Sequence, residues 1–246
     1  MKSVLIRFYE ELNDFLPKAR QKKTFLCEFT GNPSIKDLIE SVGVPHSEID
    51  LILVNGKSVN FNYSVQDGDK ISVYPVFESL DISEVQHLRA MPLRNTKFVV
   101  DVQLGVLAKY LRMLGFDALF KNNFSFEELI KFSLDERRTI LTKNGELLKR
   151  KEIIQGYFVR NNLPKNQIKE ILSRFDLVKN IKEFTRCLVC NSLLETINKN
   201  EIEYLLPPKV KESKNEFWIC KTCNKIYWKG THYLNMEKMI ENVLSL

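Results

Sequence analysis

Four of the five cysteines form two Cys-x-x-Cys pairs near the end of the 246-residue sequence. The pairs are Cys187 with Cys190 and Cys220 with Cys223, and 29 residues separate them. Each pair can form a tight turn that presents two thiolates, and two such turns complete a tetrahedral zinc site. A redox role or chance spacing is the alternative. Four thiolates leave no open coordination position, so the spacing predicts a structural rather than catalytic Zn²⁺ ion.

Asp101 is the second candidate for chemistry, because it directly follows the apolar residues 98–100 and precedes an amphipathic segment. A carboxylate between a strand and a helix is held by rigid backbone, where it can bind a divalent cation. The same position suits a helix-capping Asp, which the positive end of the helix dipole favours. The spacing alone leaves both roles open.

The elements around Asp101 predict a parallel α/β domain. Residues 98–100 are typical of a short strand, and the helix that follows should end at Gly115. Its apolar face is made by Leu104, Leu107, Ala108, Leu111 and Leu114. A strand at 117–120, a helix at 126–138 and a strand at 139–142 come next. In such sheets ligands bind beyond the carboxyl ends of the strands.

The first 77 residues predict a small mixed sheet crossed by one helix. Two strand-like segments, at 3–10 and 23–30, precede a helix at 35–42 that Ser34 should cap and Gly43 should end. An Asn-Gly pair at 55–56 is a hairpin signal, and a further strand follows the turn at 67–69. A connector at about 79–96 has no clear periodicity.

The composition, with 44% hydrophobic residues and nine glycines, is typical of a globular protein. Charges interrupt the N-terminal residues too early for a secretory signal, and no apolar run is long enough to span a membrane. Few cysteines in a chain of this length argue against a secreted disulfide scaffold, and Cys27 is interpreted as a small buried hydrophobe. We therefore expect a cytoplasmic protein without a membrane partner.

The net charge of +6 is unevenly distributed. Residues 1–80 hold 9 basic and 11 acidic side chains, a net of −2, which leaves 28 basic and 20 acidic side chains, a net of +8, for the remainder. A polyanionic partner would therefore dock on the second part of the chain.

Three groups of segments resemble the Mut-seven C-terminal ribonuclease family. VPHSEIDLILVNGKSV and DGDKISVYPVF resemble its ubiquitin-like β-grasp module, DVQLGVLAKYLRMLGFD its PIN-like nuclease domain, and RCLVCNSLL and CNKIYWKGTH its end. The resemblance implies a β-grasp domain at 1–80, a PIN-like parallel α/β domain at 96–182 and a zinc ribbon at 183–246. Because the last β-grasp strand runs on into ESLDISEVQHL without a terminal Gly-Gly, we interpret this module as a recognition or scaffold domain for a protein partner, not as a sulfur carrier.

The resemblance also implies a metal-dependent ribonuclease, with Asp101 as the first ligand of Mg²⁺ or Mn²⁺ and Lys109, Arg112 and Lys143 on RNA phosphates. Lys109 and Arg112 are equally compatible with ordinary solvated helix charges. Two positions depart from the family pattern, because Phe126 and Asn144 stand where carboxylates are usual. Glu127 is the nearest replacement for the first, and Asn144 still offers a carbonyl oxygen, although a neutral amide binds a cation more weakly and cannot act as a base. The predicted catalytic set is thus Asp101, Glu127 and Asn144.

Aromatic and basic residues follow the second cysteine pair. Trp228, Lys229 and His232, together with Tyr227, are predicted to stack RNA bases and contact phosphates. The alternative is that Trp228 packs against the zinc site and His232 makes a fixed hydrogen bond. Two hypotheses about function stay open: a ribonuclease with a depleted acidic site, and an RNA- or partner-binding protein on the same scaffold without cleavage.

Overall fold

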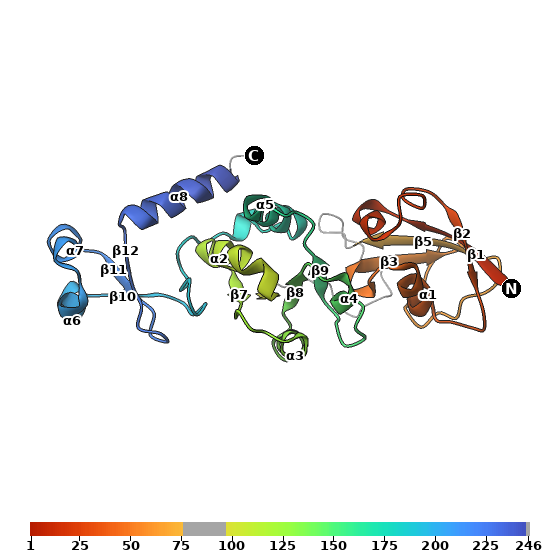
Figure 1. Cartoon of the computed structure of the whole chain (residues 1–246), viewed down its shortest axis with the longest axis horizontal. Helices are drawn as coiled ribbons and strands as arrows, with labels where there is room; N and C mark the ends of the chain where they lie inside the picture. Colours follow the sequence, from red (N-terminus) through yellow and green to blue (C-terminus); the bar gives the residue numbers. More distant parts are fainter. Residues whose placement is uncertain (76–96, 245–246) are drawn as a thin grey trace. The chain divides into compact units, whose positions relative to one another are not determined.

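The computed structural model describes residues 1–75 and 97–244 of the chain. Its elements combine an N-terminal sheet domain, a parallel α/β domain and a C-terminal cysteine cluster, as the sequence predicts (Figure 1). The chain divides into two compact units, one of Met1–Asn95 with Ile130–Phe158 and one of Thr96–Leu129 with Val159–Leu246. The domain limits proposed above stay predictions, and the predicted connector at 79–96 lies outside the described residues.

The N-terminal sheet has five strands in the order β2-β1-β5-β3-β4. Only β1 and β5 are parallel among these neighbours. The strands are β1 (Lys2–Phe8), β2 (Phe25–Phe29), β3 (Ile49–Val54), β4 (Lys57–Ser58) and β5 (Lys70–Pro75). The Asn-Gly turn joins β3 to β4, with Asn55 at φ 52° and Gly56 at φ 80°, as the hairpin signal predicts.

Helix α1 (Ile35–Val42) packs on this sheet and completes its core. Alternate residues of β1 point to one face, and Val4 and Ile6 share one buried cluster with Ile35 and Ile39. The Ser34 hydroxyl accepts a hydrogen bond from the Asp37 amide at 3.1 Å. Gly43 ends the helix at φ 112°, so both predicted helix ends are confirmed.

The segment after β1 differs from the prediction. A 3₁₀ helix, Glu10–Phe15, forms where we expected only a polar connection between strands. Asn13 stabilises this 3₁₀ helix, because its buried side-chain amide donates hydrogen bonds to the carbonyl oxygens of Phe8 and Glu10. Such short local bonds leave little periodic signal in the sequence.

The same unit includes residues 130–158, which contact the turn His46–Glu48. His46 Nε2 lies 2.9 Å from the Ile153 carbonyl oxygen, and the Ser47 hydroxyl donates to the Leu148 carbonyl at 3.1 Å. The Glu48 carboxylate accepts a hydrogen bond from the Phe158 amide. These contacts give His46 a structural role that its isolated position in the sequence does not indicate.

The second sheet has the order β7-β6-β8-β9, in which β6 runs parallel to β7 and β8 parallel to β9. Its strands are β6 (Lys97–Val100), β7 (Asp117–Leu119), β8 (Thr139–Thr142) and β9 (Gly156–Phe158). The helices are α2 (Gly105–Met113), α3 (Phe126–Glu136), α4 (Gly145–Leu148) and α5 (Pro164–Arg174). The strand-helix alternation from 98 to 142 is confirmed, whereas β9 and α5 follow in a stretch to which the sequence assigned no element.

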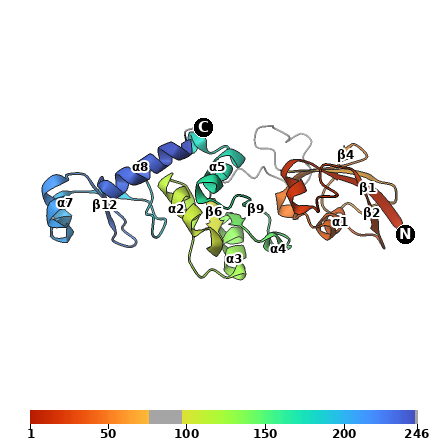
Figure 2. The same cartoon turned by 45° about the horizontal axis from the view of Figure 1, so that its top comes forward.

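The C-terminal part holds a three-stranded antiparallel sheet in the order β10-β11-β12. Its strands are β10 (Glu195–Ile197), β11 (Phe217–Ile219) and β12 (Ile226–Trp228), and its helices α6 (Lys199–Ile202), α7 (Pro208–Ser213) and α8 (Thr231–Leu244). Strands β10 and β11 pair antiparallel between the cysteine pairs, and α6 and α7 lie in the connection between these strands. Helix α8 extends from β12 to α5, which it contacts (Figures 1 and 2).

None of the helices in the described residues is both long and apolar enough to cross a bilayer.

Candidate metal centre and aromatic pocket

The four cysteines of the two pairs converge on one point. Their sulfur atoms all lie within 4.8 Å of one another, with Cys190 Sγ 3.2 Å from Cys220 Sγ and Cys187 Sγ 3.5 Å from Cys223 Sγ. A zinc ion bound at about 2.3 Å to four thiolates requires sulfur separations of about 3.8 Å. The donor set and its spacing therefore fit a tetrahedral zinc ion.

Both cysteine turns are built in the same way. The amide of the residue after each pair returns to the carbonyl of the first cysteine, from Asn191 to Cys187 at 3.0 Å and from Asn224 to Cys220 at 2.7 Å. These two residues adopt φ 75° and φ 57°. Asn tolerates this left-handed region better than most residues do, which explains why Asn follows both pairs.

The thiols differ in acidity. Burial raises the pKa of the Cys190 thiol, but hydrogen bonds from Ser192 and from neighbouring thiols outweigh it and lower that pKa to about 6. Burial and the neighbouring sulfur atoms raise the pKa of Cys223 to about 12. Four thiolates this close together therefore need a cation to ionise completely, as a bound Zn²⁺ would supply. The Tyr227 hydroxyl lies outside the cluster at 3.1 Å from Cys187 Sγ, within hydrogen-bond distance of this sulfur.

Arg112 joins the first cysteine turn to the α/β part. Its side chain is 3% exposed and donates to four carbonyl oxygens, those of Ala118, Phe120, Leu188 and Val189, at 2.8–3.4 Å. Burial lowers the pKa of its guanidinium, an effect that the nearby thiols oppose. The enclosed guanidinium donates to the protein's own backbone, so this geometry favours a structural role for Arg112 over the predicted contact with RNA phosphate.

Asn191 and Arg186 strengthen the same junction. The Asn191 side chain accepts from the Ala118 amide at 3.0 Å and donates to the Asp117 carboxylate at 2.7 Å. Arg186 donates to the carbonyl oxygens of Gly115 and Asn191 at 3.1 and 2.9 Å. The first cysteine turn is thus fixed to the first residues of β7 directly, and to α2 and the turn after it through Arg112 and Arg186.

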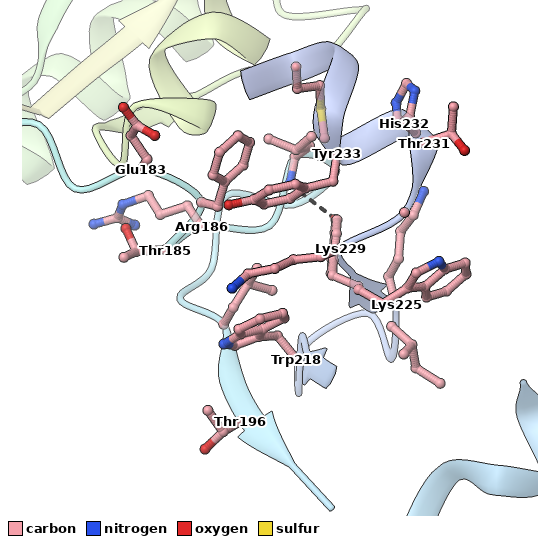
Figure 3. Close-up of a pocket in the computed structure, with 18 residues that line it drawn as sticks. Glu183, Thr185, Arg186, Thr196, Trp218, Lys225, Lys229, Thr231, His232 and Tyr233 are labelled. Atoms are coloured by element: carbon pink, nitrogen blue, oxygen red, sulfur yellow. Dashed lines mark hydrogen bonds between the residues drawn. The ribbon is translucent and has the colours of Figure 1, made fainter. Parts of the chain in front are cut away.

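An aromatic pocket of about 620 Å³ lies beside the cysteine cluster (Figure 3). The predicted residues Trp228, Lys229 and His232 all line it. Trp218 and Tyr233, which sequence reasoning missed, line it as well. A signal was available for Trp218, because it is one of only two tryptophans and lies two residues before Cys220.

Trp228 also has a packing role. It is half-buried against the small core of Ile202, Leu206 and Phe217. A Cβ atom at Gly230 would lie 2.8 Å from Trp228 Nε1, so the glycine lets the indole ring lie flat against the turn. Trp228 therefore has a packing role, but against the core of the ribbon and not against the zinc site that the alternative named. His232 is exposed at the beginning of α8.

Asp101 follows β6 directly and is 1% exposed. It begins the 3₁₀ turn Val102–Leu104, but its side chain makes no capping hydrogen bond to that turn. The capping alternative is therefore not supported, and the buried carboxylate lies at the carboxyl end of its strand.

Asn144 has the capping role instead. Its Oδ1 accepts hydrogen bonds from the amides of Glu146 and Leu147, at 3.0 and 3.2 Å, and so caps α4. Glu127 lies exposed in the first turn of α3 beside Phe126, which is 41% exposed. Glu128, and not Glu127, bonds back to the Ser125 amide at the start of this helix.

Comparison with known families assigns residues 96–240 to the family described as Mut7-C RNAse domain. The chain belongs to the Mut7-C RNAse domain family. Residues 1–81 match a second family, described as Mut7-C ubiquitin, which agrees with the predicted β-grasp module. Neither a curated protein nor a solved structure gave a match.

The Mut7-C match spans Asp101, all four cysteines and the aromatic pocket. The resemblance stated from the sequence is thereby confirmed at the level of the family. Of the basic residues it implies, Lys109 is exposed on α2 and Lys143 half-buried after β8, so both can meet solvent, unlike Arg112. Their contact with RNA stays a prediction.

Proposed function

We propose that this protein binds RNA and cleaves it slowly with the help of a divalent metal ion. The observation that carries the proposal is Asp101, a buried carboxylate at the carboxyl end of β6 in a domain of a ribonuclease family. Rigid carboxylates at such positions hold the divalent cations of phosphodiester hydrolysis. The surplus of basic residues after residue 80 supports a polyanionic substrate.

The proposed ligands of Mg²⁺ or Mn²⁺ are Asp101, Glu127 and Asn144. Magnesium in phosphoryl-transfer sites is bound by one or two carboxylates together with substrate phosphates, so RNA itself would complete this sphere. Because Phe126 and Asn144 replace two usual carboxylates, the ion would bind weakly in the absence of RNA. The bound ion would polarise the scissile phosphate, and Lys109 and Lys143 would position the RNA backbone.

A specific observation favours a second candidate, an RNA-binding protein without cleavage. The Asn144 side-chain oxygen already accepts two backbone hydrogen bonds as the cap of α4. A ligand oxygen engaged in this way is a poor donor to a cation, and an amide cannot serve as a general base. The β-grasp module would in either case recruit a protein partner, and a cytoplasmic location stays a prediction.

The experiment compares the parent protein with Asp101→Asn on labelled RNA, with Mg²⁺, with Mn²⁺ and with neither. Metal-dependent cleavage by the parent that the variant lacks supports the ribonuclease. Binding by both proteins without cleavage supports the second candidate. RNA that neither protein binds at 50 mM salt contradicts both. Circular dichroism and metal content, expected near one Zn²⁺ per chain, verify that the variant is folded.

A further inference from the structure

We propose that the aromatic pocket beside the cysteine cluster holds one unpaired base of single-stranded RNA. The inference rests on the proposed RNA association and gives it a site and a substrate form. The pocket volume, about 620 Å³, lies within the range of about 300–1,000 Å³ that ligand pockets occupy.

Trp218 and Tyr233 are the proposed stacking platforms. They come from different elements, β11 and α8, and the side chain of Lys229 lies between their rings in the view of Figure 3. The Lys229 ammonium is 5.7 Å from the centroid of the Trp218 ring. An aliphatic chain that lies along an aromatic face covers the same surface that a flat base would cover. A base that enters here would displace the Lys229 chain and stack on Trp218.

Lys229 is free to move because its ion pair is weak. Its ammonium lies 3.2 Å from the Glu216 carboxylate, and both side chains are about half exposed or more. Exposed ion pairs contribute little to stability, so exchanging this carboxylate for an RNA phosphate carries a small cost. The released ammonium would then contact the phosphate of the nucleotide whose base has taken its place on Trp218.

The polar groups of the pocket suit a nucleotide better than a purely apolar ligand. Arg186, Lys225, Lys229 and His232 line it together with Glu183, while the Glu216 carboxylate pairs with Lys229 and Glu237 lies near Tyr233. Figure 3 shows the polar side chains that line the pocket around the labelled rings of Trp218 and Tyr233. Aromatic platforms beside cations bind single strands, because a base within a duplex has no free face to stack.

Tryptophan fluorescence tests the proposal directly, because both tryptophans of the chain, Trp218 and Trp228, line the pocket. The zinc-loaded full chain is titrated with a ten-nucleotide single-stranded RNA, without Mg²⁺ or Mn²⁺ so that the RNA stays intact. We expect saturable quenching, and we expect none with the same RNA in a blunt duplex.

Three variants at two pocket positions and one control variant are compared by their RNA affinity. Anisotropy of the labelled RNA should show about 10-fold weaker binding for Trp218→Leu, the loss of one stacking platform, and a smaller loss for Trp218→Phe. Tyr233→Leu provides a second test that leaves the sheet intact. Tyr204→Leu, which alters an 81% exposed ring of the same ribbon outside the pocket, should bind as the parent does.

Failure of this proposal is distinguishable from failure of the proposed function. If RNA binds by anisotropy but Trp218→Leu and Tyr233→Leu bind like the parent, the pocket assignment is wrong and RNA association stands. Two further results overturn the pocket assignment. One is equal quenching of the tryptophan fluorescence by the duplex. The other is a loss of fluorescence that depends on protein concentration alone and occurs without RNA. If no variant and no parent binds RNA, both proposals fall.

Discussion

Among single residues, Arg112 differs most between its predicted and its observed role. A basic side chain one helical turn from exposed Lys109 suggests phosphate contact, yet Arg112 lies on the apolar face of α2 and points inward. Its acceptors are carbonyl oxygens, two of which belong to the cysteine turn 76 and 77 residues along the chain. Contacts at such separation leave no mark in local periodicity, so the sequence could not distinguish a structural arginine from a binding one.

Replacing Arg112 with Lys should therefore destabilise the fold. The ammonium keeps the charge but cannot reach four carbonyls with a planar fork, and buried acceptors would remain unsatisfied. We expect a loss of about 2–4 kcal/mol in the free energy of unfolding, measured by urea denaturation. Lys109→Ala, an exposed change on the same helix, should cost less than about 0.5 kcal/mol. An Arg112→Lys protein of parental stability but reduced RNA affinity would restore the phosphate-contact interpretation.

Glu183 gives a pH-dependent prediction. Glu183 is exposed overall, but partial desolvation of its carboxylate and the nearby carboxylates of Glu237 and Glu241 raise its pKa above the ordinary value. The folded protein therefore binds this proton more tightly than the unfolded chain does, and it loses stability as the pH rises through the raised pKa. Glu183→Gln removes this loss. The variant should be more stable than the parent at pH 7, and the difference should shrink as the pH falls to 5.

Thermal unfolding at several pH values between 5 and 8 measures this difference. Glu195→Gln serves as the control, because it changes an exposed carboxylate of the same ribbon and should alter the melting temperature little. A gain for Glu183→Gln that stays constant over this range would show that charge on Glu183 is not its cause.

At the scale of elements, helices with strong end signals were predictable. Ser34 and Gly43 delimit α1, and Gly115 at φ 88° follows the end of α2. These ends were predictable because a helix cap involves residues only a few positions apart in the sequence. Gly115 also allows the Lys182 carbonyl to approach, since a Cβ atom there would lie 2.2 Å from that oxygen. This second constraint joins distant segments, and only the structure reveals it.

Helices α5, α6 and α7 were not predicted. Leu163, which precedes α5, provides no side-chain cap, and α6 and α7 have only four and six residues, too few for an amphipathic pattern. Helix α6 does carry a local signal, a capping box of Asn198 and Glu201, which sequence reasoning missed. Its Ile202 packs in one cluster with Phe217, so capping and tertiary packing together determine this part of the connection between the two cysteine pairs.

The N-terminus of α4 offers a test of the depleted site. Asp caps a helix as well as Asn does and adds a carboxylate, so Asn144→Asp should keep α4 folded and strengthen metal-dependent cleavage if this position is a metal ligand. Asn144→Ser is the matched control, because Ser also caps but adds no carboxylate. Initial cleavage rates against Mg²⁺ concentration should show a lower midpoint for Asn144→Asp alone.

Equal rates for the two capping variants would indicate that residue 144 is structural only. Asn144→Ala, which removes the cap, should cost about 1 kcal/mol in unfolding free energy.

At the scale of the whole molecule, family and fold class were predictable, whereas the junction between ribbon and α/β part was not. The four cysteines were found because their spacing is local to each pair, and two such pairs in one chain are typical of a structural zinc site. The pocket draws on residues from 183 to 236, which lie on β10, β11, β12 and α8 and in the segments between them. Arg112, Arg186 and Asn191 connect segments more than 70 residues apart. Such sites arise only after the chain has folded.

Removal of zinc tests this junction. Without the ion, thiolate repulsion should open the cysteine turns, and Arg112 and Asn191 would lose their acceptors on the first turn and on β7. Hydrogen exchange after chelation should therefore show lost protection in the ribbon and also at the end of α2 and in β7, residues 110–119. The strands β1 and β5 provide the internal reference and should keep their protection. If exchange rises in residues 187–228 alone, the cysteine cluster stabilises only the ribbon and the Arg112 contacts do not transmit its loss.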